Sequence, residues 1–181
     1  MKQVAIPRFC TWADVDKVAE LSEKVLNGLA DAGKSDYFGG VDADEIAAAM
    51  MDPSTVIVAE DERKDIIGFL LLQKPSEEEE KIYASNFPTK YRKNEGIIVN
   101  GIGVDVNKRK GRVATTMLEF GKDYALAHGF TEYIGTIHPK NGASENALRH
   151  ISDDVEKAEP FTHRTRDGRD LLRQYFVQEL I

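Results

Sequence analysis

Residues 104–118, with the sequence VDVNKRKGRVATTML, place a basic loop between an apolar, strand-like segment and an amphipathic, helix-like segment. The cations of this loop are Lys108, Arg109, Lys110 and Arg112. Positive charge at the start of a helix is unfavourable because of the helix dipole, so four cations at this place indicate a function other than stabilising the helix. The first backbone N–H groups of a helix have no partner within it and bind an anion well. The pattern predicts a phosphate or pyrophosphate cradle, with a solvated turn as the alternative.

The glycines just before the loop do not form a dinucleotide-binding motif. Residues 101–106 read GIGVDV, which lacks the third glycine of GxGxxG, and a basic loop follows where that motif has its helix. The pair Asn100-Gly101 lies inside the apolar segment 97–106. It is compatible with a tight hairpin turn or with a β-bulge in one long strand.

Apolar periodicity predicts the elements that must hold this loop in place. We expect strands over residues 4–7, 55–59, 65–73, 97–106 and 132–137, with two more candidates at 155–162 and 171–180. We expect helices over residues 11–26, 42–51, 113–127 and 142–151. The residues at 76–95, which begin with the charge run SEEEEK, are predicted to be a surface insertion in a single domain covering 1–181. Hairpins beside one strand–helix–strand unit indicate an α+β fold with a mixed, mostly antiparallel sheet flanked by helices.

Composition limits the classes of function that are open to the chain. The 181 residues carry a net charge of −7, which argues against a general nucleic-acid binder or a binder of anionic membranes. The single cysteine, Cys10, cannot form an internal disulfide, and no apolar run is long enough to span a membrane. These features predict a cytoplasmic protein. They leave a homodimer open.

The stretch from Val104 to Ala114 resembles the central motif of the Gcn5-related N-acetyltransferases, the GNAT superfamily. That motif is a Val-x-Val-like strand end, then [Gln/Arg]-x-x-Gly-x-[Gly/Ala], then an amphipathic helix. The matching residues here are Val104, Val106, Arg109, Arg112 and Ala114. The order of predicted elements is similar to that family over essentially the whole chain. One departure stands out, because Arg112 occupies the usual glycine position and Gly111 lies one place earlier.

The resemblance implies transfer of an acetyl group from acetyl-CoA to an amine that attacks it directly. Backbone groups of Val104 and Val106 would face the pantetheine, and an N–H near Ile102 would polarise the thioester carbonyl. The pyrophosphate would be held by the backbone amides of Lys110, Gly111, Arg112, Val113, Ala114 and Thr115, with Arg109 close by. Asn141 and Ser144 resemble the strand end and helix start at which many members present an asparagine to the cofactor arm.

Proton transfer is less clearly marked in the sequence. Many members carry a tyrosine acid where this chain has Leu148, which cannot donate a proton. His138, at a predicted strand end, is a candidate catalytic residue or a structural histidine before a proline. Asn100 could orient a water molecule or simply form the bulge. Cys and His residues show no metal-ligand spacing, so we predict no metal.

The acceptor is not named by the sequence. Tyr37 and Phe38 lie before a Gly-Gly pair, in the connection where related proteins line the acceptor mouth, and are candidate substrate contacts. The alternative to an N-acetyltransferase is a degenerate module that binds acyl-CoA without turnover. The missing tyrosine and the unusual Arg112 keep that alternative open.

Overall fold

The structure, a computed structural model, describes residues 4–181, apart from the side chain of Lys110. Its strands are β1 (Ile6–Phe9), β2 (Thr55–Glu60), β3 (Ile66–Gln73), β4 (Gly96–Val104), β5 (Glu132–Ile137), β6 (Val155–Lys157), β7 (Phe161–Arg164) and β8 (Asp170–Glu179). Its helices are α1 (Val15–Asp31), α2 (Ala43–Ala49), α3 (Glu77–Asn86), α4 (Val113–Ala127) and α5 (Gly142–Arg149). Two short 3-10 turns, η1 (Trp12–Asp14) and η2 (Val106–Gly111), precede α1 and α4.

The strands form one mixed sheet in the order β1-β2-β3-β4-β5-β8-β6, and β7 also pairs with β8. The pairing of β4 with β5 is parallel, and the pairs β1–β2, β2–β3, β3–β4, β5–β8, β6–β8 and β7–β8 are antiparallel. The crossover from β4 to its parallel neighbour β5 runs through η2 and α4, as a parallel connection requires. The fold class expected from the sequence is confirmed.

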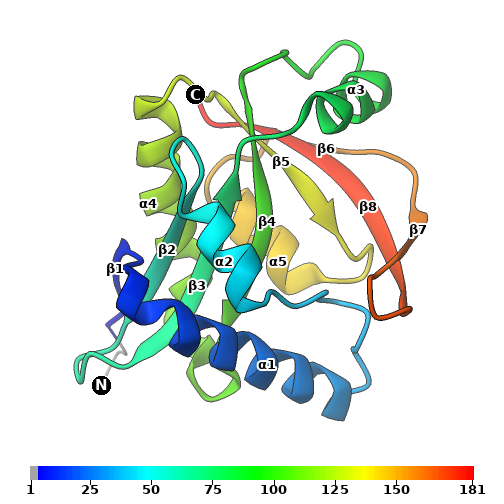
Figure 1. The fold of residues 1–181 in the computed structure, drawn as a ribbon. Coiled ribbons are helices and arrows are strands. Elements are labelled where there is room, and N and C mark those ends of the chain that lie inside the picture. Colours follow the sequence, from blue (N-terminus) through cyan, green and yellow to red (C-terminus); the bar gives the residue numbers. More distant parts are fainter. Residues whose placement is uncertain (1–3) are drawn as a thin grey trace.

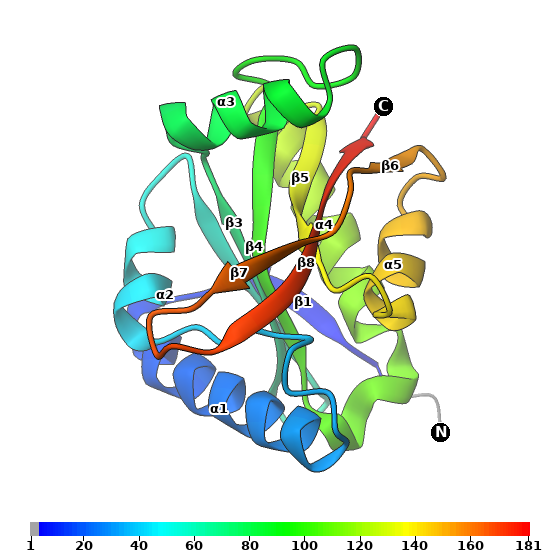
Figure 2. The ribbon, with the colours of Figure 1, turned by 90° about the vertical axis from the view of Figure 1, so that its right-hand side faces the viewer.

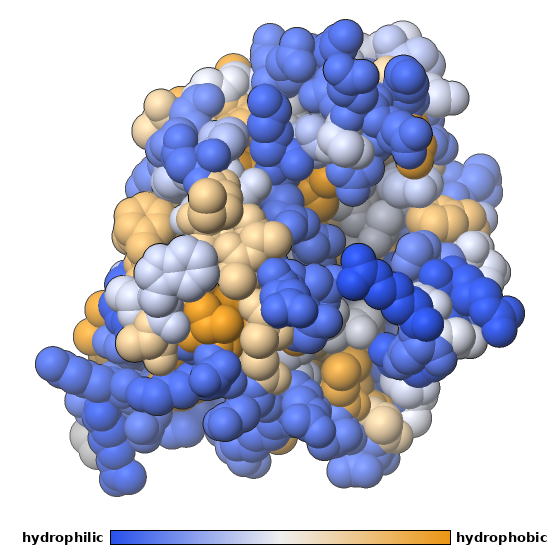
Figure 3. Space-filling view, viewed as in Figure 1, coloured by the Kyte–Doolittle hydropathy of each residue, from blue (hydrophilic) through white to orange (hydrophobic). Residues whose placement is uncertain are grey.

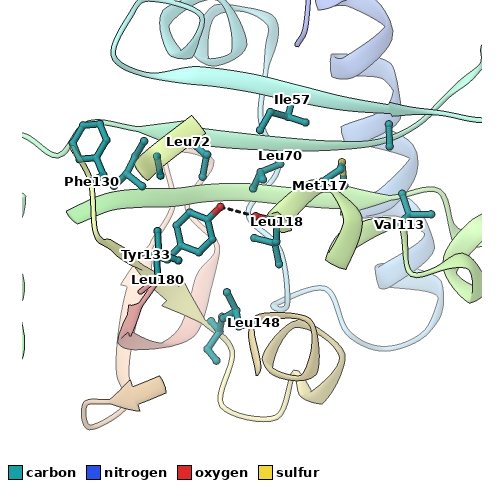
Figure 4. Packing of buried hydrophobic residues seen from close by; sticks show 14 of the residues in the cluster. Ile57, Leu70, Leu72, Val113, Met117, Leu118, Phe130, Tyr133, Leu148 and Leu180 are labelled. Atoms are coloured by element: carbon teal, nitrogen blue, oxygen red, sulfur yellow. Dashed lines mark hydrogen bonds between the residues drawn. The ribbon is translucent and has the colours of Figure 1, made fainter. Parts of the chain in front are cut away.

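Helices cover both faces of the sheet (Figures 1 and 2). Alternate residues of the central strands point to opposite faces of the sheet. Val58 and Phe69 pack against α1 and α2, while Ile57 and Leu70 pack against α4. This explains why β3 is almost continuously apolar. On the α4 face the Tyr133 hydroxyl donates to the Leu118 carbonyl at 2.8 Å inside the cluster that Figure 4 shows.

The segment 76–95 differs from its prediction as a purely surface insertion. Ser76 caps α3 by accepting from the Glu79 N–H, and Tyr83, Phe87 and Tyr91 are buried. These rings form one buried cluster with Ile98, Ile134 and Val177 of the sheet. The charge run lies on the exposed face of α3, whereas the aromatic residues of this segment add to the core.

Most predicted boundaries hold within a few residues, but the helix predicted over residues 11–26 begins at Val15 and continues to Asp31 as α1. Pro7 lies inside the edge strand β1 and does not end it. Residues 155–162 hold two short strands, β6 and the start of β7, where one was expected. Among the described residues, no helix combines the length and the apolar composition that a membrane crossing requires.

Candidate functional site

A cavity of about 840 Å³ lies where β4 and β5 separate. Its loop end, as we call it here, consists of η2, the start of α4 and the start of α5. Its hairpin end consists of the β7–β8 hairpin and the connection between α1 and α2, residues 32–42. Figure 2 shows the β7–β8 hairpin on the left of the diverging central strands and α5 on the right, with the α1–α2 connection crossing between them.

The opening is produced by the central strand. The parallel ladder of β4 with β5 ends at the pair Val99 and Gly135. At the next residue the register of β4 with β3 shifts by one position, and Asn100 is left without a partner on β3. This is the β-bulge that the sequence left open beside a hairpin turn. Residues 100–104 and 136–137 then border the cavity with backbone that the β4–β5 ladder no longer uses.

A helix starts at the loop end of this opening. The first backbone hydrogen bond of α4 runs from the Thr116 N–H to the carbonyl of its N-cap residue, Arg112, at 3.0 Å. The N–H groups of Val113, Ala114 and Thr115 precede it and so have no partner within the helix. All three residues border the cavity. The predicted anion cradle therefore has free donors and the positive end of a helix dipole at the cavity wall.

Arg112 has a backbone conformation that is usually adopted by glycine. Its φ is 56° and its ψ is 25°, in the left-handed region that favours glycine over residues with a Cβ atom. The chain thus keeps the usual turn at this position with an unusual residue. Arg112 is exposed and borders the cavity, so its side chain adds positive charge to the loop end of the cavity.

The four predicted loop cations do not act together. Lys108 turns away, with its Nζ 3.4 Å from the Asp61 carboxylate in the β2–β3 turn. Arg109 borders the cavity beside Arg112. The side chain of Lys110 lies outside the described part of the structure. Two cations are therefore placed to face an anion at the loop end.

The loop is held in position by Asp105. Its carboxylate accepts from Lys24 Nζ at 2.7 Å and from the Asn107 N–H at 2.9 Å. Burial raises the pKa of the Asp105 carboxyl, but these two hydrogen bonds and the charges of Lys24 and Lys108 together leave the pKa below its usual value. Asp105 therefore ties η2 to α1 as a carboxylate at neutral pH.

Two predicted cofactor contacts lie away from the cavity wall. β4 ends at Val104, and Val106 lies in η2 as an exposed residue whose side chain faces Gly28 of α1. Val106 does not border the cavity, nor does Gly111. The Val-x-Val pattern suggested one continuous strand, but the chain turns after Val104. Ile102 and Val104 do border the cavity, as expected.

The start of α5 forms the remaining wall of the loop end. Asn141 caps this helix, because its Oδ1 accepts from the Ser144 N–H at 3.2 Å. Both residues border the cavity, as the sequence predicted. Leu148, one of the buried residues of α5, also borders it. The position expected to carry an acid in related proteins is therefore near the cavity but apolar.

His138 is packed rather than exposed to the cavity. It is 5% exposed, and its Nε2 lies 2.8 Å from an Asp36 carboxylate oxygen. Its Nδ1 accepts from the Lys140 N–H at 3.0 Å, and its ring stacks on Tyr37 at 4.4 Å between centroids. His138 is not among the residues that border the cavity. With both nitrogens engaged, it fits a residue that positions residues 36–37 of the hairpin end, and its catalytic role stays a prediction.

The predicted acceptor contacts lie at the hairpin end. Tyr37 borders the cavity and donates its hydroxyl to the Lys140 carbonyl at 3.2 Å. Phe38 borders the cavity near Gly101 and packs against Phe69 at 6.0 Å between ring centroids. Asn100, the exposed bulge residue, also borders the cavity. The structure brings these three residues to one cavity, as expected.

The sequence reasoning missed the β7–β8 hairpin, which carries several arginines toward the same cavity. Those that border it are Arg164, Arg166, Arg169 and Arg173. Figure 3 shows the most hydrophilic side chains of this face over the hairpin. Arg169 donates to the Ser35 and Gly39 carbonyls and Arg173 to the Tyr37 carbonyl, so the hairpin holds the α1–α2 connection. The run THRTRDGR around an Asp-Gly turn was the available signal.

Arg173 differs from the other hairpin arginines by its burial. It is only 9% exposed, and Arg164 is largely exposed. Burial lowers the pKa of the Arg173 guanidinium, an effect that the Asp36 carboxylate opposes and the Arg169 cation reinforces. The group still carries its charge at neutral pH, because arginine does not lose its proton in proteins.

One further sequence pattern has the wrong structural context. Residues 28–35, GLADAGKS, have the spacing GxxxxGK[ST] of a P-loop. A P-loop needs a strand before the glycines and a helix after them, but here α1 runs through Asp31. The N–H groups of the last turn of α1 are used within the helix and cannot cradle a phosphate. The match is one of spacing alone.

Within residues 4–181, no three His, Cys, Asp or Glu side chains gather as a metal-binding group. The charged side chains that border the cavity include arginines and lysines, together with the carboxylates of Asp42, Glu45 and Asp167. Asp42 and Glu45, at the start of α2, each accept from the backbone N–H of the other residue in a capping box, and Asp167 pairs with Arg169. The wall is therefore suited to anions at both of its ends.

No protein-family model and no curated protein matches the sequence. Solved structures match its fold over nearly the whole chain. A GNAT superfamily phosphinothricin acetyltransferase from Sinorhizobium meliloti, in complex with AcCoA, aligns with a TM-score of 0.68 at 19% identity, over 99% of this chain and 89% of that one. A ribosomal-protein-alanine N-acetyltransferase from Brucella melitensis aligns with a TM-score of 0.68 at 19% identity, over 97% of this chain and 99% of that one. An acetyltransferase of the GNAT family from Streptococcus pneumoniae aligns with a TM-score of 0.70 at 11% identity, over 98% of this chain and 100% of that one.

Proposed function

We propose that this chain, which has the fold of the GNAT acetyltransferases, transfers an acetyl group from acetyl-CoA to a primary amine. One observation carries the proposal. The opening between β4 and β5 meets the N-terminus of α4, with its free N–H groups and two cations, in a single cavity. A slot for an extended arm and a cradle for a pyrophosphate are thus continuous. Acetyl-CoA has both parts, and one of the similar structures holds it.

The residues present fit acetyl-CoA in charge and in shape. The N–H groups of Val113, Ala114 and Thr115 would hold the pyrophosphate, and Arg109 and Arg112 would add attraction from the solvent side. The backbone of residues 102–104, which the β4–β5 ladder leaves unused, would bind the amide groups of the pantetheine arm. Asn141 and Ser144 would flank that arm from the start of α5.

When bound, acetyl-CoA supplies an activated thioester that an uncharged amine attacks directly. A backbone N–H near Ile102 would donate to the thioester oxygen and stabilise the negative charge that develops there. The amine has to lose a proton before it attacks, because most free amines are protonated at neutral pH. Asn100, exposed at the bulge, is placed to orient a water molecule that carries this proton away.

Leu148 and Arg112 favour a second candidate, a module that binds acyl-CoA without turnover. Leu148 supplies no acid for the departing thiolate, and Arg112 strains the turn that approaches the phosphates. A thiol has a pKa near 8.5, so the thiolate can also take its proton from water, and we therefore place transfer first.

Two measurements test the proposal together. CoA at about a hundred times its dissociation constant should stabilise the folded protein by roughly 2.7 kcal/mol, which a thermal melt detects. Free-thiol release from acetyl-CoA, measured with a panel of primary amines and with a no-amine blank, then reports turnover. Stabilisation without amine-dependent thiol release would favour the binding module. A melt that millimolar CoA leaves unchanged would remove both candidates.

A further inference from the structure

Arg173 is a buried cation that faces the cavity without a carboxylate partner. Within the described residues, its guanidinium makes a single hydrogen bond, from one terminal nitrogen to the Tyr37 carbonyl at 3.1 Å. We propose that Arg173 binds a carboxylate on the acceptor, so that the amine this protein acetylates belongs to a small molecule that carries both groups, as amino acids do. This inference rests on the proposed function and names its substrate class.

The charge of Arg173 is the first argument. A buried charge is costly unless it is paired, and proteins rarely keep one unpaired. The Asp36 carboxylate attracts the Arg173 charge, but it is already engaged with His138 Nε2 at 2.8 Å. No salt bridge within 4 Å joins Arg173 to any carboxylate in the described part of the chain. An anion delivered by a ligand would complete the site.

The geometry of the guanidinium is the second argument. Arginine has five N–H donors in a planar fork, and a carboxylate accepts from two of them at once. A single bond to Tyr37 leaves most of that fork available. None of the nitrogens of Arg173 is among the fully buried, unpaired polar atoms, so the free donors face open space in the cavity wall.

The position of Arg173 is the third argument. The β5–β8 ladder ends at the pair Ile137 and Gln174, so Arg173 is the next residue, level with the point beyond which β5 no longer continues. Leu171 and Arg173 are buried and Leu172 is exposed, which puts Leu171 and Arg173 on the same face of β8, toward the cavity. Arg109 and Arg112 belong to the loop end, at which we place the pyrophosphate. Arg173 belongs to the hairpin end, where the acceptor has to enter.

The neighbouring charges agree with this assignment. Arg166 and Arg169 border the same end and add positive charge there, although Arg169 Nε pairs with the Asp167 carboxylate at 2.8 Å. Asp42 and Glu45 also border the cavity, but each accepts from the backbone N–H of the other, and neither they nor Asp167 form an ion pair with Arg173. The hairpin end is therefore a partly enclosed, positively charged pocket beside the place of transfer.

The test compares amines that differ only by the carboxylate. L-phenylalanine with 2-phenylethylamine, and L-leucine with isoamylamine, are assayed by thiol release at saturating acetyl-CoA. We expect the wild-type protein to favour the acid-bearing member by at least tenfold in kcat/KM. Arg173→Gln can still donate to the Tyr37 carbonyl. Its kcat/KM for the acid-bearing amine should fall at least tenfold, mainly through a higher KM. Its dissociation constant for CoA should stay within twofold.

Binding is measured in parallel, so that the result does not depend on turnover of a chosen amine. N-acetyl-L-phenylalanine is titrated into the CoA complex by calorimetry, and Arg173→Gln should weaken it at least tenfold. Arg173→Lys keeps the charge but not the planar set of donors, so its affinity for N-acetyl-L-phenylalanine should fall about threefold. This variant supplies the test if Arg173→Gln does not fold. Arg63→Gln, at an exposed residue of the β2–β3 turn that does not border the cavity, is the matched control and should change neither amine turnover nor product binding.

Three outcomes would overturn the inference alone. They are equal use of both members of each pair by the wild-type protein, an equal loss for both members in Arg173→Gln, and product binding that Arg173→Gln leaves unchanged. A marked loss of CoA affinity in Arg173→Gln would place the residue at the cofactor and also refute it. Absence of both CoA binding and thiol release would remove the proposed function, and the inference with it.

Discussion

The loop end and the hairpin end of the cavity are built in different ways. The loop end uses mainly backbone, because the bulge at Asn100, the turn at Arg112 and the first N–H groups of α4 are properties of the chain path. The hairpin end uses side chains that come from residues 32–42 and 163–173, far apart in the sequence. A backbone site tolerates many side chains and is shared by proteins of one fold. A side-chain site can change with each substrate, which is why fold alone does not name the acceptor.

The largest expected effect tests whether the loop end depends on backbone donors. Ala114 is the second residue of α4 and borders the cavity. Ala114→Glu should weaken CoA binding about 100-fold, because a carboxylate would stand against the pyrophosphate at close range. The same carboxylate suits the positive end of the helix, so the melting temperature without ligand should not fall. Calorimetry and a melt of the same protein measure both effects.

Ala114→Gln is the matched control for size without charge. It should lose much less CoA affinity than Ala114→Glu. If both variants bind CoA as well as the wild-type protein does, the pyrophosphate does not lie at the start of α4. The distinction between a backbone end and a side-chain end would then fail.

The second effect separates the loop cations that face the cavity from the one that does not. Removing an exposed cation should cost on the order of 1 kcal/mol, because water screens it, and reversing its sign should cost more. Arg109→Glu should therefore weaken CoA binding at least tenfold, with a smaller loss at high salt. Lys108→Gln should change it less than twofold, since Lys108 is directed at Asp61. Equal losses in Arg109→Gln and Lys108→Gln would show that net charge matters and orientation does not.

The difference between the two ends also marks what the sequence could predict. Most of the loop end comes from residues near the end of β4, and its basic turn and helix start were predicted from local pattern, whereas the bulge was one of two alternatives at Asn100-Gly101. Val106 was misplaced, because periodicity cannot show that a strand stops at Val104 and turns. The hairpin end depends on contacts more than 130 residues apart in sequence, such as that of Arg173 with Tyr37, and no local pattern contains them. The P-loop spacing at residues 28–35 shows the converse, a local pattern that the fold does not use.

The third prediction concerns His138, which contacts Asp36 and Tyr37 of the hairpin end. If His138 positions Tyr37 through Asp36 and ring stacking, His138→Gln should raise the KM of the acceptor about fivefold, the equivalent of roughly one hydrogen bond. The kcat and its pH profile should change little, and the melting temperature should fall. Were His138 a general base, kcat/KM would drop by about a hundredfold or more, and one limb of the pH profile would disappear. Steady-state kinetics over pH 6 to 9 decides between the two roles.

The smallest effect concerns Arg112, whose backbone conformation and side-chain charge both act at the loop end. At a φ of 56° a residue with a Cβ atom is strained by about 1 kcal/mol or more, and glycine is not. Arg112→Gly removes a cation near the phosphates but relaxes the turn that presents the N–H groups, so CoA affinity should stay within about twofold or rise. Arg112→Ala removes the same cation and keeps the strain, so it should be less stable than Arg112→Gly by about 1 kcal/mol. Calorimetry with CoA and denaturant unfolding of both variants measure these quantities. If both variants lose tenfold or more in CoA affinity, the Arg112 side chain clamps a phosphate, and the loop end also depends on a side chain.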